Sequence, residues 1–205
     1  MKKSQHLKLD IQKQPKNVSG YGALSDYYML QKNYGEALKV TRAGLDQQPD
    51  NMLLRFALAG ILERSGDYEA AISEYQSLLN KDPGSIIVAN NLASLLSDHR
   101  TDKASLDQAK TLAVSLQKSP VPQFEDTLGW VNYRQSDYKA ALPLLENAAA
   151  ALPTDALVHY HLGMTYVALG QPDKAAEQFK LALDHAPDHD LEEKIRVGLT
   201  KSSTQ

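Results

Sequence analysis

The stretch from Asp155 to Asp188, DALVHYHLGMTYVALGQPDKAAEQFKLALDHAPD, contains two amphipathic helical patterns with a short break between them. One stripe of the first pattern holds His159, Leu162, Gly163 and Tyr166, and one stripe of the second holds Ala175, Phe179 and Ala182. The break, LGQPDK, offers a glycine that suits the end of a helix and a proline that suits the first turn of the next. The stretch therefore predicts a helix, a tight turn and a second helix.

This pattern returns along the chain with a period of about 34 residues. Prolines close the predicted second helices one period apart, except for one step that spans two periods and two further positions: Pro15, Pro49, Pro83, Pro153 and Pro187. Gly129 and Gly163 are also one period apart, as are Ala141 and Ala175. Because several residue types keep one register, the sequence predicts an array of helix-turn-helix repeats.

The repeats resemble those of the tetratricopeptide repeat family. YHLGMTYVALGQPDKAAEQFKLALDHAP matches most positions of the family pattern, and DTLGWVNYRQSDYKAALPLLENAAAALP matches it nearly as well. The resemblance implies an all-α, right-handed superhelical solenoid of about five helix-turn-helix units with a C-terminal capping helix. It also places Gly129 and Gly163 at the small-residue position where the two helices of a unit come close, whereas Ser25 is a mild departure there.

We expect one repeat domain over residues 1–205. Its repeats are predicted at 18–51, 52–85, 86–121, 122–155 and 156–189. Residues 190–205 are interpreted as a capping helix and tail, with Leu191, Ile195 and Leu199 facing the last repeat. Residues 1–15, including Leu7 and Ile11, are interpreted as the remnant of a preceding repeat, which leads to the hypothesis that the chain is a segment of a longer array.

The third repeat is irregular, because Pro83 and Pro153 are two residues further apart than two full periods. We expect a longer turn, DHRTDKAS, ahead of a second helix around Leu106–Lys118, partly offset by a shorter link near Pro120 and Pro122. Extra residues in a repeat array usually emerge as a surface loop.

Composition excludes several functional classes. The net charge of −3 gives no general electrostatic reason to bind nucleic acid, and the absence of cysteine excludes disulfides, thiolate zinc sites and cysteine nucleophiles. No apolar run approaches the roughly 20 residues of a membrane span, and the first residues lack the apolar segment of a signal peptide. A cysteine-free chain suits the cytoplasm and an oxidising bacterial envelope equally.

Catalytic and metal-binding patterns are weak. The chain has no glycine-rich phosphate loop, nucleophile elbow or zincin motif, so we expect no enzymatic activity and no cofactor. His159 and His161 are two apart on a predicted helix and point to different faces, which argues against a shared metal. His185 and His189 lie among aspartates, but Pro187 interrupts the helix that would align them. The sequence therefore predicts no metal site.

The family resemblance implies a concave groove, lined by the first helix of each unit, that holds an extended peptide or a partner helix. Carried over position by position, this groove consists of Asp26, Met29, Leu30, Phe56, Glu63, Arg64, Asn90, Ser94, Asp98, Asp126, Trp130, Tyr133, Arg134, Tyr160 and Met164. The carboxylate clamp of the co-chaperone members is not expected, because the matching places carry no basic residue: Gly22, Asp26, Ala57, Ile87 and Asn91.

An aromatic cluster lies towards the C-terminal half of this predicted groove. Trp130, Tyr133 and Tyr160 are expected to act as apolar anchors for a partner, and Arg134 as a hydrogen-bonding or cation–π contact. Asn90 and Asp126 are expected to fix the partner's register. The alternative is that Trp130 packs against the loop of the preceding unit or the neighbouring first helix.

Two functions remain open at this point. The first is a non-catalytic scaffold that binds a partner protein or peptide in the groove. NNLASLL, followed by DTLGWVNYRQSDYKAALPLLENA and HYHLGMTY, is also similar to the C-terminal part of bacterial tetratricopeptide proteins of exopolysaccharide export and envelope protein sorting. That resemblance implies a periplasmic or envelope-associated protein. The second function is a carbohydrate-binding module whose aromatic groove contacts the exported polysaccharide.

Overall fold

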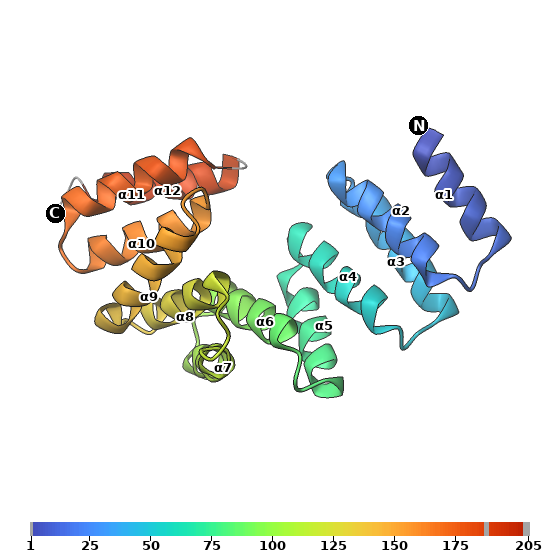
Figure 1. Ribbon diagram of the computed structural model, residues 1–205, viewed down its shortest axis with the longest axis horizontal. Coiled ribbons are helices and arrows are strands. Elements are labelled where there is room, and N and C mark those ends of the chain that lie inside the picture. The colour runs from blue at the N-terminus through green and yellow to red at the C-terminus, as the bar shows by residue number, and fades with distance from the viewer. Residues whose placement is uncertain (1, 187–188, 203–205) are drawn as a thin grey trace. The chain divides into compact units, whose positions relative to one another are not determined.

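The computed structural model describes residues 2–186 and 189–202, and this part of the chain contains twelve α-helices and no strand (Figure 1). The predicted all-α class is confirmed. The first helices of successive pairs are α2 (Val18–Leu30), α4 (Met52–Arg64), α6 (Ile86–His99), α8 (Pro122–Arg134) and α10 (Ala156–Ala168). Their second helices are α3 (Tyr34–Gln47), α5 (Tyr68–Lys81), α7 (Lys103–Ser115), α9 (Tyr138–Ala151) and α11 (Pro172–Asp184). Helix α1 (Lys2–Lys13) precedes the pairs and α12 (His189–Ser202) follows them.

The turn inside each pair is three residues long, and its local chemistry explains why the first helix ends there. The side chains of four residues cap the second helices by accepting a hydrogen bond from a backbone N–H in the first turn: Asn33, Asp67, Asp102 and Asp137. In four turns the residue before the N-cap adopts a positive φ, which Gly66 and Gly170 adopt without strain and Lys32 and Ser136 adopt at some cost.

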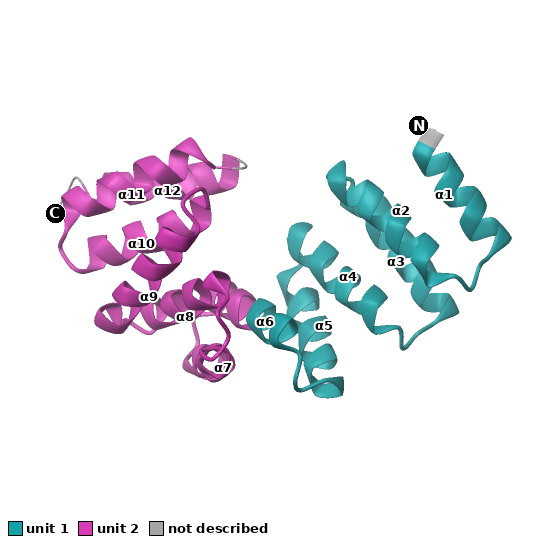
Figure 2. Ribbon diagram, viewed as in Figure 1, with its two compact units in different colours: residues 1–92 teal, residues 93–205 magenta. Residues whose placement is uncertain are grey.

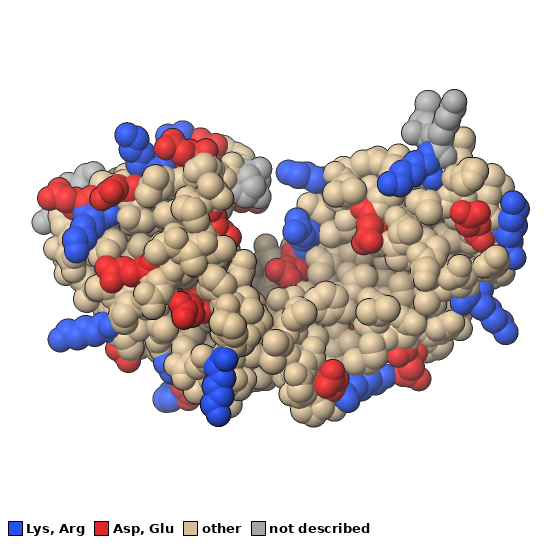
Figure 3. Space-filling view, viewed as in Figure 1, with Lys and Arg blue, Asp and Glu red and all other residues tan. Residues whose placement is uncertain are grey.

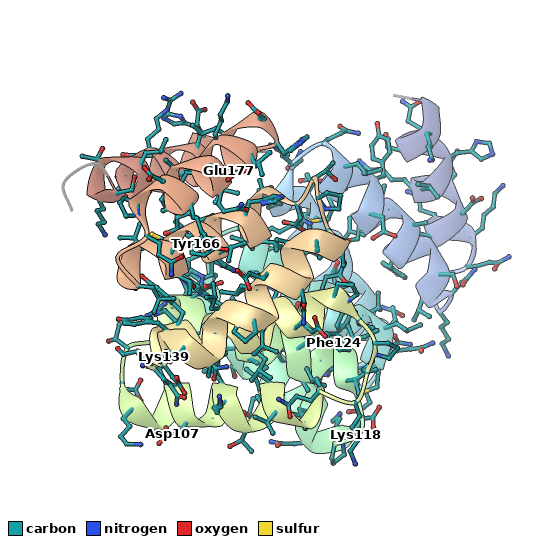
Figure 4. All side chains as sticks on the ribbon, turned by 60° about the vertical axis from the view of Figure 1, so that its left-hand side comes forward. Asp107, Lys118, Phe124, Lys139, Tyr166 and Glu177 are labelled. Atoms are coloured by element: carbon teal, nitrogen blue, oxygen red, sulfur yellow. The ribbon has the colours of Figure 1, made fainter. Side chains whose placement is uncertain are left out.

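The irregular third pair differs from the expectation. The first helices begin at a constant interval along the chain, except that α8 starts two positions late relative to α6. The turn before α7 is not lengthened, because Asp102 accepts the amide hydrogen bond of Ser105 at 2.9 Å and starts the helix at Lys103. The extra residues lie in the link 116–121, which is longer than the four-residue links 48–51, 82–85 and 152–155. Figure 4 shows Phe124 of α8 near this link, which carries Lys118.

The helices form two compact units, residues 1–92 and 93–205, with α6 running from one into the other (Figure 2). In the first unit the core contains Leu24, Tyr28, Ala37 and Ile61, and Leu7 and Ile11 of α1 pack against it. Ser25, the departure from glycine or alanine, is fully buried, and its hydroxyl shares a 2.8 Å hydrogen bond with that of Thr41 on α3. This partner explains why a hydroxyl is tolerated there.

The second unit is built around close helix contacts at glycines. The fully buried ring of Phe179 on α11 lies between two of them: a Cβ added at Gly163 of α10 or at Gly198 of α12 would meet that ring at 2.6 Å. A Cβ at Gly129 would meet Leu145 of α9 at 2.6 Å. The predicted close approach at Gly129 and Gly163 is therefore confirmed.

Helix α12 covers one end of this core. Ile195 is completely buried, and Leu191 and Leu199 pack against the same cluster as Phe179. Within residues 2–186 and 189–202, every helix is too short or too polar to cross a lipid bilayer.

Candidate binding surface

Trp130 is buried, with 6% of its surface exposed. Its ring is sandwiched between Tyr133, at a centroid distance of 4.6 Å and an interplanar angle of 5°, and His161, at 4.0 Å and 13°. The indole N–H donates a 2.6 Å hydrogen bond to Asp98 of α6. Trp130 therefore packs between the neighbouring first helices, which is the alternative that the sequence left open, and neither face of its ring is open to a partner. The side chain points away from the contact between α8 and α9, as predicted, but Asp98 of α6 and His161 of α10 cover it.

The charged residues of this cluster are also satisfied within the chain. Asp126 is buried, and both of its carboxylate oxygens accept from Nδ1 of His161, at 3.0 and 3.2 Å. The guanidinium of Arg134 donates to the backbone carbonyls of Ser97 and Arg100 at the end of α6. These bonds tie α8 to α6 and α10, so Asp126 and Arg134 hold neighbouring first helices rather than present free groups to a partner.

Three further predicted groove residues, Tyr133, Tyr160 and Met164, are half-buried and pack against the core of the second unit. Burial raises the pKa of Tyr133 to about 12, and the nearby hydroxyls of Tyr138 and Tyr160 add to the rise. Burial also raises the pKa of Tyr160, with a further contribution from the carboxylate of Asp98. Both phenols therefore stay neutral at physiological pH and act as apolar packing surfaces.

The histidines contribute to structure in the same way. His159 contacts the side-chain oxygen of Gln178 at 2.8 Å and the carbonyl of Pro153 at 3.1 Å, so both ring nitrogens are used. His161 is held by Asp126 and covered by the Trp130 ring. In the described residues, no three His, Asp or Glu side chains are grouped so as to hold a metal ion. Pro187, beside His185 and His189, lies outside the described residues.

An open hollow of about 490 Å³ lies between α2 and α4 in the first unit. Its lining consists of Ser25, Asp26, Met29, Leu30, Phe56, Ala57, Gly60, Ile61 and Arg64. The sequence placed five of these residues in the groove, and the structure brings them together here: Asp26, Met29, Leu30, Phe56 and Arg64. The hollow falls within the range of about 300 to 1,000 Å³ that is typical of ligand sites.

Charge distinguishes this hollow from the aromatic cluster. Asp26 and Arg64 are exposed, and within the described residues neither side chain makes a hydrogen bond or an ion pair. Basic and acidic side chains are interspersed over the face of the molecule in Figure 3, with broad uncharged areas between them. The hollow therefore combines an apolar floor with one unpaired anion and one unpaired cation.

The wall around Phe56 is held in place from behind. Its ring packs edge-on against Tyr75 of α5, at a centroid distance of 5.9 Å and an angle of 64°. The Tyr75 hydroxyl donates to Glu63 and accepts from Asn91, both at 3.2 Å. Burial, and then the Glu63 carboxylate, raise the pKa of Tyr75, so this hydroxyl remains a donor. Phe56 is thus a pre-positioned contact surface.

Sequence reasoning missed Ser25, Gly60 and Ile61 as lining residues, and it considered Ala57 only for a carboxylate clamp. A signal for Gly60 was present, since it lies four residues after Phe56 and four before Arg64 and so shares their helix face.

Asn90, which the sequence also placed in the groove, does not line the hollow. It is half-buried on α6, and its side-chain oxygen has no hydrogen-bond partner among the described residues.

A smaller hollow of about 210 Å³ lies in the second unit, beneath the link that follows α7. Leu116, Ser119 and Phe124 contribute to its lining. It contains none of the residues that the sequence placed in the groove, so the α2–α4 hollow is the better candidate for partner binding.

Comparisons with known proteins agree with this architecture. The tetratricopeptide repeat (TPR) family pattern matches residues 28–96 and 133–195, more than half of the chain. Tetratricopeptide repeat protein 8 of Caenorhabditis elegans is 25% identical over 191 residues, which cover 92% of this chain and 37% of that protein. The chain thus spans little more than a third of the length of this relative.

Solved structures show the same fold. TTC0263, a thermophilic TPR protein of Thermus thermophilus, has a TM-score of 0.71 and 20% identity, covering 89% of this chain and 99% of that one. YrrB, described as a TPR protein with an unusual peptide-binding site, has a TM-score of 0.61 and 17% identity, covering 95% of this chain and 99% of that one. Together with the matched pattern and the paired helices, these similarities show that the chain belongs to the tetratricopeptide repeat family.

Proposed function

We propose that this chain is a non-catalytic scaffold that binds a segment of a partner protein in the hollow between α2 and α4. The observation that carries this proposal is the combination of an apolar floor with the unpaired side chains of Asp26 and Arg64. A partner segment could bury the floor and pair with these charges at the rim, which is the usual division of a protein interface. The description of YrrB as having a peptide-binding site is consistent with this use of the fold.

The apolar contacts supply most of the expected binding energy. Leu30 is 84% exposed, and it lines the hollow together with Met29 and Phe56. Methionine adapts its shape to different partners, whereas the Phe56 ring is fixed by Tyr75. Energetic hot spots are typically large side chains of this kind near the centre of an interface.

The biological setting that we propose is bacterial exopolysaccharide export or envelope assembly, with a periplasmic or envelope-associated location. Its support is the similarity in sequence of NNLASLL, DTLGWVNYRQSDYKAALPLLENA and HYHLGMTY to proteins of that setting. The alternative, a carbohydrate-binding module, loses its main support in the structure. Stacking on a sugar needs an open aromatic face, and both faces of Trp130 are covered, by Tyr133 and His161.

Phe56→Ala is expected to weaken binding of a partner peptide tenfold or more, because truncation of a central hot-spot residue costs about 2 kcal/mol or more. The probe is obtained by selecting random peptides of about twelve residues on the immobilised full chain and synthesising the strongest binder. Its affinity is measured by isothermal titration calorimetry for the unmodified chain and the variant.

Leu157→Ala is the control, since Leu157 is a large apolar residue of a first helix and, like Phe56, is at least partly accessible, but it does not line the hollow. It should leave the affinity unchanged, and circular dichroism should show both variants folded. Equal affinities of the Phe56→Ala variant and the unmodified chain would mean that the selected peptides bind elsewhere, contrary to the proposal.

A further inference from the structure

Gly60 is a helical glycine that packing within the chain does not explain. At Gly44, Gly129, Gly163 and Gly198, an added Cβ would lie 2.6 to 2.8 Å from a neighbouring side-chain atom. At Gly60 the nearest such atom is the Tyr75 hydroxyl oxygen, at 3.8 Å, which is an ordinary contact distance. A glycine inside a helix costs about 1 kcal/mol relative to alanine. Helix α4 therefore carries this cost at a position where the chain itself has room for a side chain.

The position of Gly60 on the helix indicates what the open space could receive. Phe56 and Arg64 lie four residues before and after it, about 6 Å away along the helix axis on the same face. All three residues line the hollow, together with the small side chain of Ala57. This face of α4 therefore presents an aromatic ring, a bare strip of backbone and a cation in succession.

The opposite wall of the hollow carries the complementary charge. Asp26 lies on α2, one turn before Leu30, and its carboxylate makes no bond to a described residue. A partner segment lying over Gly60 would therefore meet a cation at one side and an anion at the other. Complementary charges at an interface rim select partners and orient them, whereas like charges exclude them.

We infer that Gly60 is a specificity-determining position that receives a bulky apolar side chain of the partner segment, flanked by an acidic residue that pairs with Arg64 and a basic residue that pairs with Asp26. This inference rests on the proposed function and adds the chemistry of the partner. The occupant is a polypeptide of mixed charge with a large aliphatic or aromatic residue at its centre. The bare backbone at Gly60 allows that side chain to approach more closely than any other residue type would permit.

Gly60→Leu tests the apolar part of the inference with the selected peptides as probes. The added side chain occupies the open space, so we expect the affinity to fall at least tenfold without a lower melting temperature. Gly60→Ala, whose methyl group fits the available space, should weaken binding less and keeps the test informative if the leucine variant misfolds. Gly22→Leu is the matched control, because an added Cβ at Gly22 of α2 likewise meets no close contact, with nothing within 4 Å, but Gly22 does not line the hollow.

Arg64→Glu tests the charge part. For each selected peptide, a version is synthesised in which its acidic residues are replaced by lysine. We expect the unmodified chain to prefer the acidic version about tenfold and the Arg64→Glu variant to prefer the lysine version. Unchanged preference in the variant would overturn the assignment of Arg64.

The outcomes separate this inference from the proposed function. If Phe56→Ala weakens binding while Gly60→Leu does not, the hollow still binds peptides but the role given to Gly60 is wrong. If neither variant affects any selected peptide, the proposed function fails and this inference fails with it.

Discussion

Trp130→Ala is expected to lower the free energy of unfolding by about 3 to 5 kcal/mol, the range for truncation of a buried tryptophan. The variant loses the stacked contacts with Tyr133 and His161 and the hydrogen bond to Asp98. It also leaves a cavity among α6, α8 and α10, the first helices that this ring joins. Urea unfolding followed by circular dichroism measures the loss, because the signal comes from helices throughout the chain.

Trp130→Phe provides a graded comparison. It keeps an aromatic ring between Tyr133 and His161 but removes the N–H that donates to Asp98, so a smaller loss of about 1 to 2 kcal/mol is expected. If Trp130→Ala unfolded at the same urea concentration as the unmodified chain, the ring could not be an element of the packing between these helices.

Gly163→Leu is expected to lower the free energy of unfolding by about 1 to 3 kcal/mol through overpacking. Its Cβ alone would lie 2.6 Å from the ring of Phe179, which is fully buried and also in contact with Gly198 on its other side. The ring has no free space to move into, so α10 and α11 must separate. The shift of the thermal unfolding midpoint measures this effect.

Gly22→Leu is the control for helix propensity, since it makes the same substitution in a first helix where an added Cβ meets nothing within 4 Å. It should be neutral or stabilising by up to about 1 kcal/mol. Similar midpoints for the two variants would contradict the assignment of Gly163 to the close contact between α10 and α11.

The fold could be predicted from sequence because its signals are local and repeated. The regular period and the apolar stripes predicted paired helices, and the position of Gly129 predicted a close approach that the contact with Leu145 confirms. The third pair was less predictable. Whether extra residues lengthen a turn or a link depends on the capping of α7 by Asp102, and several polar residues nearby could have served as that cap.

The surroundings of Trp130 could not be predicted in the same way. Helical geometry correctly turned the side chain away from the seam between α8 and α9, but the groups that cover it come from the preceding and following repeats, Asp98 and His161. Sequence periodicity tells which face a residue occupies and not whether neighbouring helices leave that face open. Phe56 and Arg64 were placed in the groove by the same reasoning as Trp130. They remain accessible because they line the hollow between α2 and α4.

The most direct test of the binding surface is a chemical-shift map. Backbone amide spectra of the isotope-labelled full chain are recorded by nuclear magnetic resonance with and without the selected peptide. We predict that the largest shifts occur at residues 56–64 of α4 and 26–30 of α2, which line the hollow. Shifts confined to α8 and α10, around Trp130 and Tyr160, would show that partners bind at the aromatic cluster. That result would contradict the proposal that partners bind in the hollow between α2 and α4.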